Sequence, residues 1–132
     1  MSDYKVCRLD QDVEDAFGGQ YPGEMRFATG PLGSEQVAFT YRRMPQHTGG
    51  KGSYGHRHKT QEEVYFVISG RLQMKLDDDV IELGPGTVVR VAPHVVRSLW
   101  NDEPEDAHLT IVSRKIDDPH GDAETVDNFW PE

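Results

Sequence analysis

The sequence predicts an all-β fold, an antiparallel sandwich or barrel built from short strands. From residue 24 onward, short runs of β-branched and aromatic residues are divided by Gly, Pro, Asp and Asn. Residues 71–76 alternate strictly between polar and apolar side chains, which is the period of a strand with one buried face. Many short strands with regular turns and almost no helix indicate a closed or two-layered β-structure.

The expected elements begin with one short helix. Residues 11–17 could form a helical turn or two, which Gly18 and Gly19 would end. Ser69-Gly70 predicts a tight hairpin between two strands, and residues 77–79, three consecutive Asp, predict the next turn. In chain order, the strands are expected at residues 24–28, 36–43, 63–68, 71–76, 80–83, 88–91, 97–100 and 108–113.

The 132 residues are enough for one domain with a modest core. We expect a single domain over residues 1–132, with the barrel at about 24–115. Residues 117–132 are polar until Phe129 and Trp130, which we expect to pack onto the barrel because two aromatic side chains are costly to leave in water. The alternative is a frayed tail.

Composition and charge exclude several function classes. The net charge is 14 − 23 = −9, and such a surface repels nucleic-acid phosphates. No apolar run approaches the roughly 20 residues that cross a bilayer, and no signal peptide is evident. The single cysteine, Cys7, suits a reducing compartment. We therefore expect a cytoplasmic protein without nucleic-acid or membrane partners.

The most informative segment contains two histidines and a glutamate. Side chains two residues apart in a strand share a face, so His56 and His58 can bind one small object together. Glu63 follows a short polar turn and can reach them from the neighbouring strand. Two imidazoles and one carboxylate form the ligand set of many first-row transition-metal sites.

The spacing of this segment resembles the first motif of the cupin family. Gly50 is followed by five residues, His56-x-His58, four residues, Glu63, six residues and Gly70, with no position out of register. The resemblance implies an antiparallel jelly-roll β-barrel and commonly a homodimer. A dimer would also cover exposed strand edges.

The second cupin motif is present with departures. Gly86 and Asn101 frame it, but Ala92 occupies the position of the family's Pro and His94 that of its Gly. Arg97 stands where the resemblance implies a fourth metal ligand, a histidine. A guanidinium stays protonated and cannot coordinate a cation.

Three arrangements around Arg97 are open. In the first, Arg97 turns aside and leaves a three-ligand site of His56, His58 and Glu63. In the second, Arg97 pairs with Glu63, or with an anionic ligand, in a charge-assisted fork that replaces the metal. Alternatively, His94 swings in as the missing imidazole, although its turn position favours exposure to solvent.

The barrel interior is the expected ligand site. Tyr65 and Val67 share the parity of Glu63, and Leu99 shares that of Arg97. We therefore predict Arg97, Tyr65 and His94 as ligand-binding residues. The remaining candidates for the wall are Leu72, Met74, Leu76, Phe39, Tyr41 and Trp100.

Two functions follow from these residues. The first is a cytoplasmic, metal-dependent enzyme, an oxygenase or an isomerase-like protein, that holds Mn, Fe, Ni or Zn on His56, His58 and Glu63 and acts on a small, anionic organic molecule. The second is a metal-free binding protein or sensor in which Arg97 pairs with Glu63 or with an anionic ligand. The sequence identifies neither the substrate nor the reaction.

Overall fold

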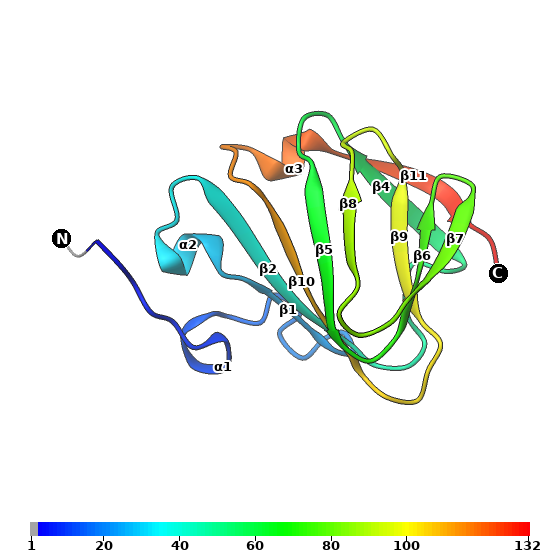
Figure 1. Cartoon of the computed structure of the whole chain (residues 1–132), viewed down its shortest axis with the longest axis horizontal. Coiled ribbons are helices and arrows are strands. Elements are labelled where there is room, and N and C mark those ends of the chain that lie inside the picture. Colours follow the sequence, from blue (N-terminus) through cyan, green and yellow to red (C-terminus); the bar gives the residue numbers. More distant parts are fainter. Residues whose placement is uncertain (1–2) are drawn as a thin grey trace.

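Two antiparallel β-sheets face each other in the computed structural model, which describes residues 3–132 (Figure 1). The first sheet has the order β1-β2-β10-β5-β8, and the second has the order β11-β4-β9-β6-β7, with β3 paired to β9. Only short helices accompany the sheets in these residues. The predicted all-β antiparallel fold is confirmed.

The strands of the first sheet are β1 (Glu24–Phe27), β2 (Val37–Met44), β10 (Ala107–Arg114), β5 (Glu63–Ser69) and β8 (Val88–Val91). Those of the second are β11 (Ala123–Trp130), β4 (Ser53–His58), β9 (Arg97–Asn101), β6 (Leu72–Leu76), β7 (Asp79–Leu83) and the short β3 (Thr48–Gly49). The helices are α1 (Leu9–Asp12), α2 (Thr29–Leu32) and α3 (Pro119–Asp122).

All eight predicted strands are present, each within one residue of the predicted bounds. Three strands come in addition: β3, β4 and β11. β4 carries the two histidines and pairs with β11, which contains the aromatic residues of the C-terminus. Trp130 at its end is buried.

The helix predicted at residues 11–17 is wrong in its extent. Helix α1 ends at Asp12, because the groups that would continue it are engaged elsewhere. The side chain of Arg26 donates to the carbonyls of Leu9 and Val13, and the amide of Phe17 donates to the carboxylate of Asp15. The chain therefore turns where an α-helix would have needed those carbonyls.

The core lies between the sheets. Along β6, Leu72 and Met74 point inward and are almost fully buried, whereas Gln73 and Lys75 between them point outward. This is the period-2 pattern that the sequence shows. The buried apolar cluster consists of Met44, Tyr65, Val67, Leu72, Met74, Leu83, Val91, Leu99, Ala107 and Leu109.

Two glycines of the first motif are required by close approaches of the chain. Gly70 has φ +78° in the hairpin between β5 and β6, and a Cβ there would lie 2.6 Å from the carbonyl oxygen of Asp106. At Gly50, a Cβ would overlap the hydroxyl of Ser98 on β9. The motif spacing therefore also fixes how the loops pack onto the strands that carry the histidines and the glutamate.

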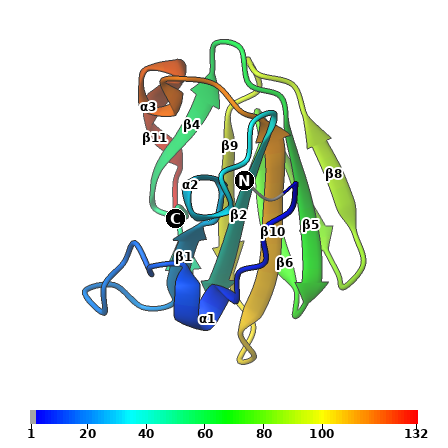
Figure 2. The ribbon, with the colours of Figure 1, turned by 90° about the vertical axis from the view of Figure 1, so that its left-hand side faces the viewer.

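The expectation that Phe39 and Tyr41 contribute to the barrel interior is wrong. Met44 belongs to the core, so Arg42 and Thr40 share its inward face and the residues between them point outward. Figures 1 and 2 place α1 and α2 beside β1 and β2, and this N-terminal segment covers the outer face. Phe39 lines an outer pocket there with Cys7, Leu9, Val13, Ala28 and Leu32.

Trp100 also faces outward. Its neighbour Leu99 is buried in the core, and the alternation of β9 directs the indole to the opposite side. There it stacks on His47, with ring centroids 6.0 Å apart. None of the three aromatic side chains therefore reaches the interior.

Candidate metal centre

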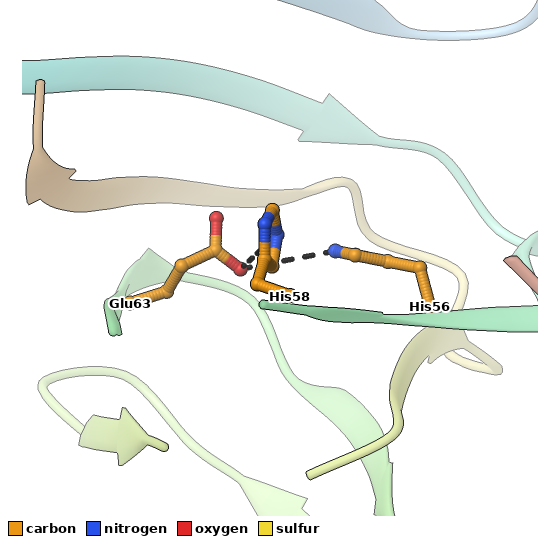
Figure 3. A group of neighbouring side chains, drawn as sticks. All are labelled: His56, His58 and Glu63. Carbon is orange, nitrogen blue, oxygen red and sulfur yellow. Dashed lines mark ion pairs between the residues drawn. The ribbon is translucent and has the colours of Figure 1, made fainter. Parts of the chain in front are cut away.

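The two histidines and the glutamate of the first motif converge inside the barrel. His56 and His58 lie on the same face of β4, and Glu63 is the first residue of β5. Potential ligand atoms of these three residues all lie within 4.8 Å of one another. Figure 3 shows both imidazoles directed at one carboxylate oxygen of Glu63. The Nε2 atoms of His56 and His58 are 3.8 Å and 3.5 Å from that oxygen, Oε1.

Glu63 is held by two further side chains. The hydroxyl of Tyr65 donates to Oε1 over 2.8 Å, and Nη1 of Arg97 donates to the same oxygen over 3.1 Å. Burial alone would raise the pKa of Glu63, but the nearby side chains of His56, His58 and Tyr65 outweigh it and hold the pKa far below its usual range. Glu63 is therefore an anion at any physiological pH.

His58 is oriented by Asp122, a residue of α3. Nδ1 of His58 lies 3.2 Å from Oδ2 of Asp122, and both side chains are 7% exposed. Burial raises the pKa of Asp122, but hydrogen bonds from Thr60, Gln61 and His58 outweigh it and keep the group ionised. Because an ionised carboxylate only accepts hydrogen bonds, Nδ1 of His58 donates to Asp122, which leaves Nε2 as the ring nitrogen that can bind a metal ion.

The environment of Nε2 suits a metal ion. Nε2 of His58 is buried and has no hydrogen-bond partner among residues 3–132. A buried polar atom without a partner is costly, and a cation between His56, His58 and Glu63 would satisfy it. A carboxylate that accepts from the second nitrogen of a metal-binding histidine is the usual way of fixing its orientation. The donor set thus fits a divalent transition metal.

Access to the centre is from the side of His56. Its side chain is 37% exposed, whereas that of His58 is 7% exposed. Thr125 of β11 pairs with His56, shares its face and is also exposed. A small molecule could therefore approach the three residues past His56.

Arg97 makes the contact with Glu63 that the second arrangement predicts, but through a single hydrogen bond and not a fork. It pairs across strands with His56, so its side chain points inward, and it is 1% exposed. Besides Glu63, it donates through Nη2 to the carbonyl of Ala92 over 2.8 Å. At about 5 Å and an effective dielectric constant near 20, its charge would repel a divalent ion by roughly 6–7 kcal/mol. The ion pair weakens the site for metal without separating its three ligands.

His94 does not join the centre. It is exposed in the turn between β8 and β9 and is not part of the cluster of His56, His58 and Glu63. Tyr65, in contrast, is 2% exposed and touches Glu63 directly. The roles of both residues in ligand binding stay predictions.

The chain belongs to the cupin family. Residues 43–113, more than half of the chain, match the cupin domain profile. This range begins at the end of β2 and ends within β10, so it includes both motifs and the three converging residues.

Solved cupins share the fold at low sequence identity. A cupin protein from Bacteroides fragilis is 22% identical with a TM-score of 0.68, covering 87% of this chain and 86% of that one. A protein from Acidithiobacillus ferrooxidans, named as a supposed sugar phosphate isomerase, is 18% identical with a TM-score of 0.62 over 80% of this chain and 76% of its own. These likenesses support the jelly-roll fold.

A third similar structure comes from a regulatory protein. The cupin domain of an XRE family transcriptional regulator from Enterobacter cloacae is 18% identical with a TM-score of 0.61, covering 74% of this chain and all of that one.

No curated protein sequence matches the chain. Within residues 3–132, no helix is long and apolar enough to cross a membrane. At these identities the solved structures show the fold, and the fold does not fix the function.

Proposed function

We propose that this chain is a cytoplasmic, metal-dependent cupin that acts on a small, anionic organic molecule as an oxygenase or an isomerase-like enzyme. The observation that carries the proposal is the environment of His58. Asp122 holds the proton on Nδ1, and the partnerless Nε2 faces Glu63. His56, His58 and Glu63 would hold Mn, Fe, Ni or Zn, which supplies a Lewis acid with open coordination positions.

The protein groups around the ligands have separate tasks. Tyr65 and Arg97 fix Oε1 of Glu63 and leave Oε2 without a hydrogen bond from residues 3–132. The pKa of Tyr65 is well above its usual value because the ring is buried, so its hydroxyl keeps its proton and stays a donor. The carboxylate is thereby fixed before any ligand arrives, which lowers the cost of ordering it on binding.

The test is metal analysis of protein purified without chelators and without a nickel column. We expect bound transition metal, or uptake of added Zn²⁺ or Mn²⁺, in the wild type, and loss of both in His58→Ala. His94→Ala is the matched control: this exposed histidine should not contribute, so its variant should keep the metal. Wild-type protein that contains no transition metal and takes none up would reject the proposal.

A metal-free binding protein is the second candidate, and the ion pair between Arg97 and Glu63 favours it. The pair neutralises Glu63 inside the barrel and already supplies a cation. In this case Arg97→Ala would abolish ligand binding, whereas His58→Ala would leave it largely intact. The same pair of variants therefore separates the two candidates.

A further inference from the structure

A second arginine points into the barrel. Arg42 lies on β2 on the face of Met44, and it pairs across strands with Leu109, which is fully buried. Residues that pair across antiparallel strands share a face, so the side chain of Arg42 starts from the inner surface. Its neighbour Arg43 starts from the outer surface.

Arg42 has no counter-ion within residues 3–132. Its buried Nε has no hydrogen-bond partner, and none of its nitrogens forms an ion pair there. Arg43, in contrast, pairs with Glu24 and Asp106. Arg97, the other inward arginine, is engaged by Glu63 and a backbone carbonyl. Nε of Arg97 also lacks a partner, so what distinguishes Arg42 is that no carboxylate of the described residues pairs with its guanidinium.

The charge of Arg42 persists despite its surroundings. Burial lowers its pKa, but a guanidinium starts so far above neutrality that it stays protonated in proteins. The side chain is partly buried, and its buried Nε donor has no partner, so a bidentate pair with a carboxylate or phosphate would satisfy it. A donor in this state can be completed by an anion from outside the chain.

The surroundings of Arg42 are aromatic and connect it to the metal centre. Tyr54 and Tyr65 are close enough to interact electrostatically with the guanidinium. Tyr54 lies on β4 with His56 and His58 on the same face and is 57% exposed. Phe27 pairs with Thr40 on the inner face of β1 and is 53% exposed. Tyr54 and Phe27 thus offer exposed aromatic surface on the same inner face as Arg42.

We propose that Arg42 is the anion anchor of the barrel, binding the carboxylate or phosphate of an organic ligand whose apolar or aromatic body rests against Tyr54 and Phe27. This proposal refines the substrate class of the proposed function. It rests on that function in one respect: the other end of the ligand is placed toward His56, His58 and Glu63. Arg97 then serves to position Glu63, while the ligand's anion binds elsewhere.

The test is calorimetric titration of metal-free protein with three probes: benzoate, phenyl phosphate and the uncharged benzamide. We expect one of the two anions to bind more tightly than benzamide by about tenfold or more, because charge-assisted hydrogen bonds exceed neutral ones. Arg42→Met should weaken binding of that anion by about 10- to 100-fold and leave binding of benzamide unchanged. Arg42→Lys, which keeps the charge but loses the fork, should fall between.

Arg90→Met is the matched control, because Arg90 is exposed and pairs only with Glu62 at the surface. It should bind the anion like the wild type. Should Arg42→Met not fold, the comparison of Arg42→Lys with Arg90→Lys replaces it. Wild-type protein that binds neither anion at millimolar concentrations, or binds benzamide equally well, would overturn the anchor, as would unchanged affinity in the Arg42 variants.

Metal-free protein is used so that the two proposals can fail separately. Zn²⁺ binding to Arg42→Met is measured in parallel and should equal that of the wild type. Anion binding without any uptake of metal would refute the metal-dependent function but leave the anchor standing. Metal uptake without anion selectivity would refute the anchor but leave the metal-dependent function standing.

Discussion

At the scale of single residues, the contact between Asp122 and His58 is what distinguishes this site from a chance group of polar side chains. Asp122 is buried, and it accepts from the amides of Thr60 and Gln61 as well as from His58. Helix α3 thereby ties the loop after β4 to the histidine. The carboxylate fixes both the ring orientation and the position of its proton.

We expect Asp122→Asn to weaken Zn²⁺ affinity by about 10- to 100-fold, because the amide no longer holds the Nδ1 proton as an anion does. A competitive titration against a chromophoric chelator measures this. Asp127→Asn, at an exposed aspartate on β11, is the control and should bind Zn²⁺ like the wild type. Unchanged affinity in Asp122→Asn would show that the contact is structural only.

Arg97 gives the second prediction at this scale. Arg97→His would remove a positive charge beside the ion and place an imidazole at the position where the cupin motif has a ligand. We expect the affinity for Zn²⁺ to rise by about 100-fold or more, a fraction of the electrostatic repulsion estimated above. The metal-free variant should lose roughly 3–5 kcal/mol of stability, because Glu63 loses its buried partner.

Zn²⁺ titration and thermal unfolding of the metal-free protein measure the two effects. Arg57→His is the control, since Arg57 lies on the same β4 strand as the histidines but points outward and pairs with Glu124 at the surface. Weaker Zn²⁺ binding by Arg97→His would contradict the view that Arg97 opposes the metal.

At the scale of elements, local patterns predict strands well and their partners poorly. The strands β5 and β6 were predictable because a turn signal, Ser69-Gly70, separates two runs with strand composition. The grouping of His56, His58 and Glu63 also follows from short spacing and one turn. Each of these inferences spans fewer than about ten residues, within which strand periodicity fixes direction.

Strand β2 shows where the same reasoning fails. Its outward residues include Val37, Phe39 and Tyr41, whose apolar and aromatic side chains are typical of strand residues that face a core. Phe39 and Tyr41 line outer pockets together with residues of the N-terminal segment, a tertiary contact that no local period reveals. Because Phe39 and Tyr41 were expected inside the barrel, the inward position of Arg42, the residue after Tyr41, was not predicted.

Asp122 could not be found from the sequence for a related reason. It stands 64 residues after His58, in a polar segment without a motif, and reaches the site because β11 pairs with β4. The residues of β11 from Ala123 to Asp127 read Ala-Glu-Thr-Val-Asp, which does not alternate between apolar and polar side chains as a half-buried strand does. A partner so remote in sequence depends on sheet topology.

At the scale of the whole molecule, one face of the first sheet carries exposed apolar side chains. Phe66 pairs with Val88 across β5 and β8, and Ile68 follows on the same outer face. Their exposures are 38%, 60% and 46%. Figure 1 shows β2 on one side of β10, near helices α1 and α2, and β5 and β8 on the other side. Neighbouring exposed apolar side chains of this kind make the face a candidate for an interaction site.

We expect this face to be the interface of a homodimer, because two copies related by a twofold axis would bury the same three side chains against each other. Light scattering coupled to size-exclusion chromatography should show a dimer for the wild type. Phe66→Glu should shift it to a monomer, since an interface that buries a carboxylate without a partner is strongly disfavoured and each copy already carries a net charge of −9.

The matched control for the interface is Val80→Glu, which adds the same charge at a similarly exposed valine on β7 in the other sheet. It should remain dimeric, because repulsion spread over the whole surface changes little with one more carboxylate, whereas a carboxylate within the interface acts at contact distance. A monomeric wild type would contradict the dimer. A dimer that tolerates Phe66→Glu but not Val80→Glu would place the interface on the second sheet.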